Sequence, residues 1–231
     1  MQTLKDSVGK KGRNLHGDVE AVQKALNLAG FTVGRADGIC GPKTISGITR
    51  CQQSVRAAPT GLLDPKSSVW QNVSRVAEAK AAELEREWGG DSSLWPQEKK
   101  LLSMAPALRL KVRLVIASLK QEGFRPKIVY GWRSVKVQAR LVEEGKSKVR
   151  FSFHNAQLPD GTPNSYAADI IDERWGWNED AMKEGFWKAL GKTARVNGLV
   201  WGGAWTSFPD WAHVQSRQNS ELSAVKLEIA L

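Results

Sequence analysis

The sequence predicts an α+β protein, with a small N-terminal domain of three helices and a larger C-terminal domain in which helices flank an antiparallel sheet. Three observations lead to this prediction. Apolar residues recur every three or four positions in the first part of the chain, as in amphipathic helices. A run of glycine, aspartate and serine at residues 89–93 then breaks the chain. Beyond it, β-branched and aromatic segments alternate with helical ones.

These breaks define the predicted domains. We assign residues 1–88 to the N-terminal domain, with a core at about 13–75, residues 89–103 to a linker, and residues 104–231 to the C-terminal domain. A chain of 231 residues is long enough for two domains of this kind, and its apolar content is sufficient for a core. We expect a monomer.

The composition is strongly basic, with a formal net charge of +10 at pH 7. Such a charge favours an anionic partner. Nucleic acid is not expected, because the chain has no arginine-rich tract or nucleic-acid motif. No apolar run is long enough to predict a transmembrane helix, and residues 1–6 lack the apolar stretch of a signal peptide. We therefore expect the protein to be made and kept in the cytoplasm.

The two cysteines, Cys40 and Cys51, both lie in the N-terminal domain. A cytoplasmic origin favours free thiols over a disulfide. Their spacing is not that of a zinc finger, so a thiolate metal site is not expected.

Helical periodicity defines the N-terminal elements, which we expect at about residues 17–30, 43–54 and 66–88. Asp18 is predicted to cap the first helix, and Gly30 is predicted to end it. The third helix is rich in alanine, glutamate and lysine, which gives it a high helix propensity.

A glutamine in each of the first two helices and a glycine-rich loop between them form an ordered motif set. Its segments are Val22-Gln23-Lys24-Ala25-Leu26, Gly30-Phe31, Asp37-Gly38-Ile39-Cys40-Gly41-Pro42-Lys43-Thr44 and Cys51-Gln52. Over roughly residues 13–75 the chain thus resembles the small helical peptidoglycan-binding domain of many cell-wall hydrolases. Cys40 and Cys51 stand where that family usually has an aromatic residue. The resemblance implies peptidoglycan as the ligand, with Asp37 and Thr44 as turn and cap residues rather than ligand contacts.

The C-terminal domain is predicted to alternate helices and strands. Helices are expected at 97–122, with an interruption at Pro106, at 134–144 with Ser134 as N-cap, and at 178–196; strands are expected at 127–132, 166–172, 199–201 and 211–215. This mixed order favours an antiparallel sheet.

Two of the three histidines stand in apolar or aromatic segments with acids nearby. His154, Asp169 and His213 can supply the imidazole and carboxylate ligands of a catalytic zinc site, which leaves a fourth position open for water. Asp210, three residues before His213, can supply the acid/base group that such a site needs. Spacing alone also allows a structural role for these residues.

Four ordered segments surround these candidates. They are Tyr130-Gly131-Trp132-Arg133-Ser134 with Gln138, then Ser152-Phe153-His154-Asn155, then Ala167-Ala168-Asp169-Ile170, then Asp210-Trp211-Ala212-His213-Val214. In these segments residues 104–216 resemble the zinc peptidases of the D-Ala-D-Ala carboxypeptidase and L-alanyl-D-glutamate endopeptidase family.

The resemblance implies a role for each matched residue. His154, Asp169 and His213 are the expected Zn²⁺ ligands, and Asp210 is the expected catalytic base and later proton donor. Arg133 is expected to hold a substrate carbonyl oxygen or carboxylate, which suits a guanidinium. The alternative for Arg133 is a surface ion pair.

The chain departs from the family pattern between the first histidine and the aspartate. Their separation is fifteen positions here instead of about seven, so the intervening residues are expected to form an inserted surface loop. Asp160 in that loop is a rival ligand, but we favour Asp169 because it runs into an apolar strand. Ser165 replaces a family glycine. Ser152 and Gln138 are expected to support the site rather than react.

A wall-binding domain joined to a wall peptidase, without a signal peptide, resembles a phage endolysin. The resemblance implies cleavage of the L-Ala–D-Glu bond of the peptidoglycan stem peptide, after release from the host cytoplasm through a separate pore. The alternatives are a D-Ala-D-Ala carboxypeptidase and a non-catalytic peptidoglycan-binding protein. The positive charge can also attract the protein to anionic cell-surface polymers or lipopolysaccharide, which predicts salt-sensitive binding to cells.

Overall fold

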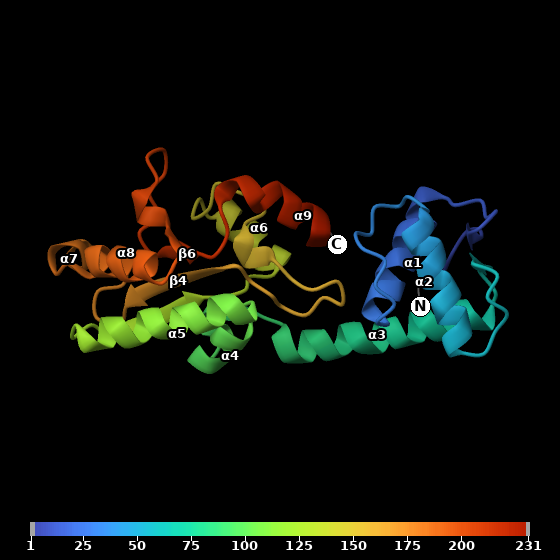
Figure 1. The fold of residues 1–231 in the computed structure, drawn as a ribbon, viewed down its shortest axis with the longest axis horizontal. Helices are drawn as coiled ribbons and strands as arrows, with labels where there is room; N and C mark the ends of the chain where they lie inside the picture. Colours follow the sequence, from blue (N-terminus) through green and yellow to red (C-terminus); the bar gives the residue numbers. More distant parts are fainter. Residues whose placement is uncertain (1–2, 230–231) are drawn as a thin grey trace. The chain divides into compact units, whose positions relative to one another are not determined.

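The computed structural model describes residues 3–229 and confirms the α+β prediction (Figure 1). The chain divides into two units, one formed mainly by residues up to 88 and the other mainly by residues 89–225. In the described part of the chain, no helix is both long enough and apolar enough to cross a membrane.

Three helices form the N-terminal unit, as predicted: α1 (His16–Leu28), α2 (Pro42–Ser54) and α3 (Ser68–Trp88). Their apolar faces share one core, which includes Val22, Leu26, Ile48, Cys51 and Trp70. A short antiparallel pair, β1 (Val8–Gly9) with β2 (Leu62–Leu63), completes the unit. This pair was not predicted, because a two-residue strand has no detectable periodicity.

A buried glutamine on each of the first two helices holds a loop in place. The Gln23 side-chain amide donates to Asp37 Oδ1, the Ile39 carbonyl and Thr44 Oγ1 at 3.0–3.1 Å, and its oxygen accepts from the Gly38 backbone N–H at 2.9 Å. Asp37 is the expected turn residue, since it also accepts from the Ile39 N–H at 2.9 Å. Thr44 is structural but is not a cap, because the N-cap of α2 is Gly41 and has no side-chain cap hydrogen bond.

The second glutamine, Gln52, repeats this arrangement. Its amide donates to Thr60 Oγ1 and the Leu62 carbonyl at 2.9 and 2.8 Å, while its oxygen accepts from the Gly61 N–H at 2.9 Å. Both glutamines form hydrogen bonds to backbone N–H and C=O groups of irregular loops. These groups have no partner in a helix or sheet, so the glutamine side chains supply the hydrogen bonds that they need.

Two details of this unit bear on the sequence predictions. Asp18 is not the N-cap of α1, because the helix begins one turn earlier, at His16. The buried carboxylate of Asp18 instead accepts backbone N–H groups of Lys5 and Asp6 at 2.9–3.1 Å. Cys40 and Cys51 are free thiols, as expected.

The segment expected to be a linker is folded. It contains the 3₁₀ turn η1 (Ser92–Leu94) and helix α4 (Gln97–Leu102). The Lys100 side chain is buried, and its ammonium donates to the carbonyl oxygens of Ser93 and Ile128 at 2.6 and 3.1 Å. Lys100 therefore links this segment to the sheet of the second unit.

The C-terminal unit contains four strands, β3 (Pro126–Tyr130), β4 (Ala167–Asp172), β5 (Val200–Trp201) and β6 (His213–Gln215). They form an antiparallel sheet in the order β3-β4-β6-β5. The unit's further elements are α5 (Pro106–Gln121), α6 (Val135–Glu143), α7 (Glu179–Lys183), α8 (Phe186–Val196) and the turns η2 (Phe153–Asn155), η3 (Gly202–Ala204) and η4 (Asn219–Glu221). Helix α9 (Leu222–Ile229) follows, and the division assigns it to this unit only as far as Val225. The interruption before Pro106 and the Ser134 N-cap are both confirmed.

One helical prediction needs correction, and one helix was missed. The single helix expected at 178–196 is two helices, α7 and α8. Gly185 between them adopts a left-handed φ of 79°, which a continuous α-helix does not allow. Helix α9, at the end of the described residues, was not predicted.

Helices α5 and α8 cover one face of this sheet (Figure 1). The core between them contains Leu108 and Val112 of α5 and Leu190 of α8, together with Ala168 and Ile170 of β4. Side chains alternate between the two faces of a strand. The residues between these apolar positions therefore face away from the helical layer.

Asp172, at the end of β4, is a buried acid. Its carboxylate accepts from the Arg125 N–H at 2.7 Å and from the Arg174 guanidinium at 2.8 Å. Burial raises the pKa of Asp172, but the hydrogen bonds of Arg174 and of the backbone outweigh this effect and lower it to about 2. The carboxylate is thus stabilised in its charged form.

We expect Asp172→Asn to lower the free energy of unfolding by about 2 kcal/mol at pH 7. Because the folded pKa lies below the unfolded one, this contribution is present above pH 4 and is lost as the pH falls toward 2. Urea unfolding at several pH values measures it, with Asp180→Asn on exposed α7 as the control. Parallel pH curves for Asp172→Asn and the parent protein would contradict the assignment.

Candidate metal centre

The register of two neighbouring strands brings Asp169 and His213 together. Asp169 of β4 is directly opposite His213 of β6 in the antiparallel ladder. The alternate residues Ala168 and Val214 belong to the core, so Asp169 and His213 both point to the other face of the sheet. Directly opposed side chains on one face are near neighbours.

The third member, His154, comes from the turn η2 rather than from the sheet. Its Nδ1–H donates to the Gly131 carbonyl, at the end of β3, at 2.6 Å. Gly131 has no room for a side chain, since a Cβ there would lie 2.5 Å from the Lys100 carbonyl oxygen and 2.6 Å from Ser103 Oγ. The glycine of the Tyr-Gly-Trp-Arg motif therefore allows the backbone to approach closely enough to orient His154.

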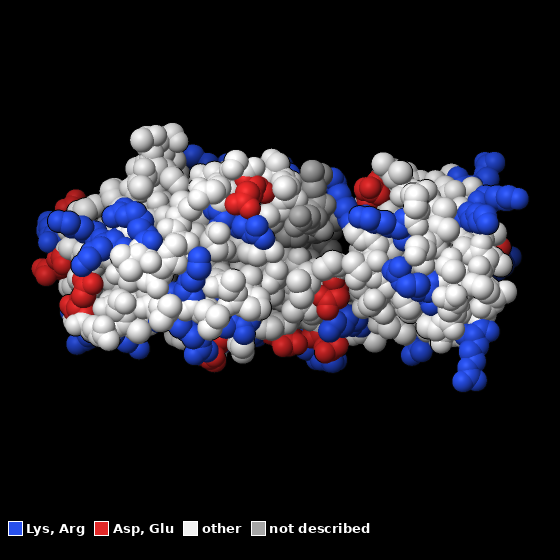
Figure 2. Space-filling model, viewed as in Figure 1, with Lys and Arg blue, Asp and Glu red and all other residues white. Residues whose placement is uncertain are grey.

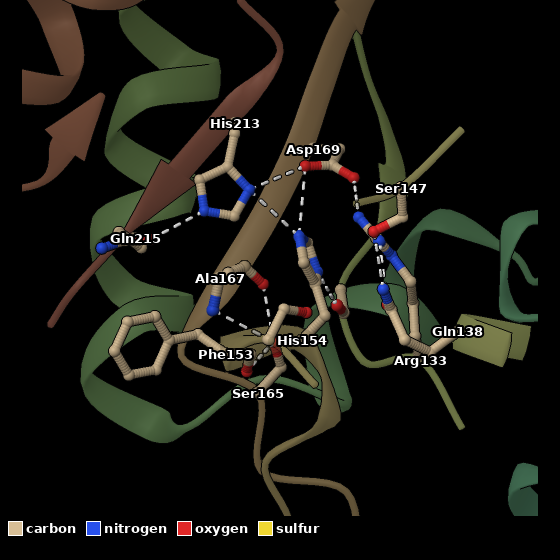
Figure 3. A network of polar contacts seen from close by, with 12 residues as sticks. Arg133, Gln138, Ser147, Phe153, His154, Ser165, Ala167, Asp169, His213 and Gln215 are labelled. Atoms are coloured by element: carbon tan, nitrogen blue, oxygen red, sulfur yellow. Dashed lines mark hydrogen bonds and ion pairs between the residues drawn. The ribbon is translucent and has the colours of Figure 1, made fainter. Parts of the chain in front are cut away.

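Three ligand atoms converge at this point (Figure 3). His154 Nε2 lies 3.1 Å from Asp169 Oδ1 and 3.2 Å from His213 Nδ1, and the latter two atoms are 3.2 Å apart. Ligands at about 2.0–2.1 Å from a tetrahedral zinc ion are separated by about 3.3 Å. The triangle therefore fits such an ion without rearrangement.

In each histidine, one ring nitrogen is held by a hydrogen bond outside the cluster, which leaves the other ring nitrogen available as a ligand. The Nδ1 atom of His154 is bonded to a carbonyl, and the Nε2–H of His213 donates to Gln215 Oε1 at 2.9 Å. The Gln215 amide is oriented in turn, because it donates to the Arg217 carbonyl at 2.7 Å. The other ring nitrogen of each histidine therefore points toward the Asp169 carboxylate. When neither of these nitrogens carries a proton, three acceptors converge, and this arrangement suits a bound cation.

The pKa shifts agree with this arrangement. Burial, and then the charge of Arg133, lower the pKa of His154 to about 4, so it is neutral at pH 7. Burial also lowers the pKa of His213, but the hydrogen bond and charge of Asp169 outweigh it and the pKa is raised. Burial alone raises the pKa of Asp169, whereas His154 and Arg133 together lower it well below its usual range. A proton on His213 is therefore the group that a bound metal replaces.

Arg133 is buried next to the cluster and is not a surface residue. Its guanidinium forms an ion pair with Asp169 Oδ2 and donates to Gln138 Oε1 at 3.2 Å (Figure 3). The ion pair of the alternative prediction is present, but it is buried rather than at the surface. No acceptor among residues 3–229 lies within hydrogen-bonding distance of Arg133 Nε. Arg133 orients one oxygen of Asp169 and keeps one donor unused.

Asp210 lines the same cavity as the three ligands. Burial, followed by the charge of Asp169, raises the pKa of Asp210 above its ordinary value. The adjacent turn is close-packed: a Cβ at Gly202 would lie 2.7 Å from the Asp210 carbonyl oxygen and 3.0 Å from His213 Cβ. A carboxyl group with a raised pKa beside three candidate metal ligands has the properties of a general base.

The other sequence candidates are also placed by the structure. Asp160, the rival ligand, is outside the cluster and its carboxylate accepts from the Thr162 N–H at 3.0 Å. Ser165, at the family glycine position, is buried and its hydroxyl donates to the Ala167 carbonyl at 2.7 Å. Ser152 lines the cavity. Gln138 is buried against Arg133, which agrees with a supporting role.

Two contributors were not identified from the sequence. Gln215 fixes the tautomer of His213, and Trp205 places its ring 5.2 Å from the His213 ring. A signal existed for Gln215, since it lies two residues after His213 and hence on the same strand face. No sequence pattern distinguishes Trp205 from its neighbouring tryptophans.

The cluster lies in a cavity of about 1000 Å³. Its lining combines the cluster with charged and aromatic side chains, among them Arg140, Lys146, Lys148, Trp177 and Phe208. A space of this size is at the upper end for small-molecule pockets.

Two comparisons with known proteins found similarities. Residues 16–67 match the family model described as a putative peptidoglycan binding domain. A solved structure, the L-Ala D-Glu endopeptidase ChiX of Serratia marcescens, is similar at 26% sequence identity and a TM-score of 0.38, over 52% of this chain and 84% of ChiX.

Proposed function

We propose that the protein is a zinc-dependent peptidoglycan endopeptidase that cleaves the L-Ala–D-Glu bond of the stem peptide. The observation that carries the proposal is the convergence of His154, Asp169 and His213 beside Asp210 in one cavity. The family match at residues 16–67 supports peptidoglycan as the polymer that is bound. The choice of bond rests on the resemblance of the four C-terminal segments to the endopeptidase branch of the family.

His154, Asp169 and His213 would hold the metal, and an open position for substrate would remain. When bound, zinc lowers the pKa of a water molecule and polarises the scissile carbonyl group. Asp210 accepts the proton of the attacking water and returns it to the leaving amine. Arg133 keeps the Asp169 carboxylate oriented, and its unused Nε–H is a donor for a substrate oxygen.

The surface charge suits a cell-wall target. The net charge is +4 for residues 1–88 and +6 for residues 89–231, so both parts of the chain contribute to the total of +10. On the face shown in Figure 2, Lys and Arg side chains are spread in several groups. We propose that this charge attracts the protein to anionic surface polymers, and that the protein acts as a phage endolysin released from the host cytoplasm.

Mass spectrometry of fragments released from purified sacculi, with and without a zinc chelator, tests the proposal. We expect a new N-terminus on D-Glu that disappears with chelator and returns with added zinc. Loss of only a terminal D-Ala would identify a carboxypeptidase instead. Binding to sacculi without any released product would leave a wall-binding protein.

A further inference from the structure

The cavity beside the metal cluster is lined by four cationic side chains, of which three have carboxylate partners. Arg133 pairs with Asp169, and Arg140 pairs with Asp91 at 2.6 Å. The Lys146 ammonium lies 2.8 Å from Glu144 Oε2. The fourth cation is Lys148, which forms no ion pair with any carboxylate in the part of the chain that the structure describes.

An aromatic ring holds Lys148 at the cavity. Its ammonium lies 4.3 Å from the centroid of the Phe208 ring, and both residues line the cavity. Phe208 is half exposed and lies two residues before Asp210. A cation–π contact positions an ammonium without neutralising its charge. Lys148 therefore retains its positive charge next to the loop that carries Asp210.

The residues on either side of Lys148 are hydrogen-bonded to Gln138, which also contacts Arg133. The Gln138 amide donates to Ser147 Oγ at 2.9 Å and to the Val149 carbonyl at 2.6 Å (Figure 3). The oxygen of the same amide accepts from Arg133, which pairs with Asp169. Lys148 is thus held relative to the ligands before any substrate binds, which lowers the cost of ordering it on binding.

We propose that Lys148 and Phe208 form a subsite for a carboxylate of the substrate, and that Lys148 determines specificity for acidic peptides. The proposal rests on the proposed peptidase function. A single unpaired ammonium suits a singly charged carboxylate, since the acids Glu144 and Asp210 in the same lining would repel a polyanion. The apolar ring face of Phe208 is available to the aliphatic part of the same residue.

Equilibrium binding separates this proposal from turnover. The probes are L-alanyl-γ-D-glutamyl-L-lysine and the same peptide with every carboxylate converted to a carboxamide. Binding of each to the zinc-loaded full chain carrying Asp210→Asn is measured by calorimetry. We expect Lys148→Gln in this background to weaken binding of the carboxylate peptide about fivefold and to leave the carboxamide peptide unchanged. Lys148→Arg should retain the preference.

Lys136→Gln is the matched control, because Lys136 is an exposed lysine of α6 outside the cavity lining. Equal weakening of both peptides by Lys148→Gln, no weakening of either, or no binding of either peptide to the parent would each overturn the subsite. Failure of the chain with Asp210 intact to cleave the bound peptide would count against the proposed function alone.

Discussion

Replacement of Asp210 by asparagine is expected to lower kcat by about 10²- to 10⁴-fold while the protein still binds zinc. Asparagine has the size of aspartate but cannot accept the proton of the attacking water. Because Asp210 is not one of the three converging ligands, the metal content should stay at the parent level. Product release from sacculi and metal analysis of the same samples measure both quantities.

The matched control for this variant is Asp160→Asn, which changes an acid of the inserted loop that lies outside the cluster. Its activity should equal that of the parent protein. An Asp210→Asn protein that cleaves at the parental rate would show that another group is the base. The raised pKa of Asp210 also predicts that the acid limb of kcat/KM lies above the ordinary pKa of an aspartate.

The second large effect is expected on metal binding. His213→Ala removes one of three ligands and should weaken zinc binding by more than about 100-fold, since changes to residues that only support ligands already cost 10- to 100-fold. Calorimetric titration with zinc measures this loss. His16→Ala is the control, because His16 is the remaining histidine and lies in the N-terminal unit.

The same site predicts how affinity depends on pH. The pKa of His213 is raised, so the proton that competes with the metal is bound already at a pH above the ordinary value for histidine. Zinc affinity should be constant above that pKa and should fall about tenfold for each pH unit below it. Zinc binding by His213→Ala at parental affinity would exclude this residue as a ligand.

The ligand set could be proposed from the sequence because its residues stand in short ordered segments that resemble those of a known peptidase family, whereas their spacing alone left a structural role open. The choice of Asp169 over Asp160 followed from the apolar strand around Asp169, and the structure places Asp169 in the cluster. The structure adds that alternation along β4 directs Asp169 away from the core.

The supporting contacts could not be derived in this way. The ion pair of Arg133 with Asp169 joins residues 36 positions apart, and it depends on the register between β3 and β4. The two-residue strands β1 and β2 are too short to give a pattern. The break between α7 and α8 at Gly185 was missed, because a glycine within a long helical pattern does not by itself predict a left-handed φ.

The two histidines of the cluster present different ring nitrogens, Nε2 from His154 and Nδ1 from His213. The zinc-bound protein should therefore contain one imidazole with a protonated Nδ1 and one with a protonated Nε2. These two N–H groups are held by a backbone carbonyl and by Gln215, so both should exchange slowly with solvent. Nuclear magnetic resonance can then follow the ring N–H signal of each histidine separately, and each signal reports whether the metal is bound.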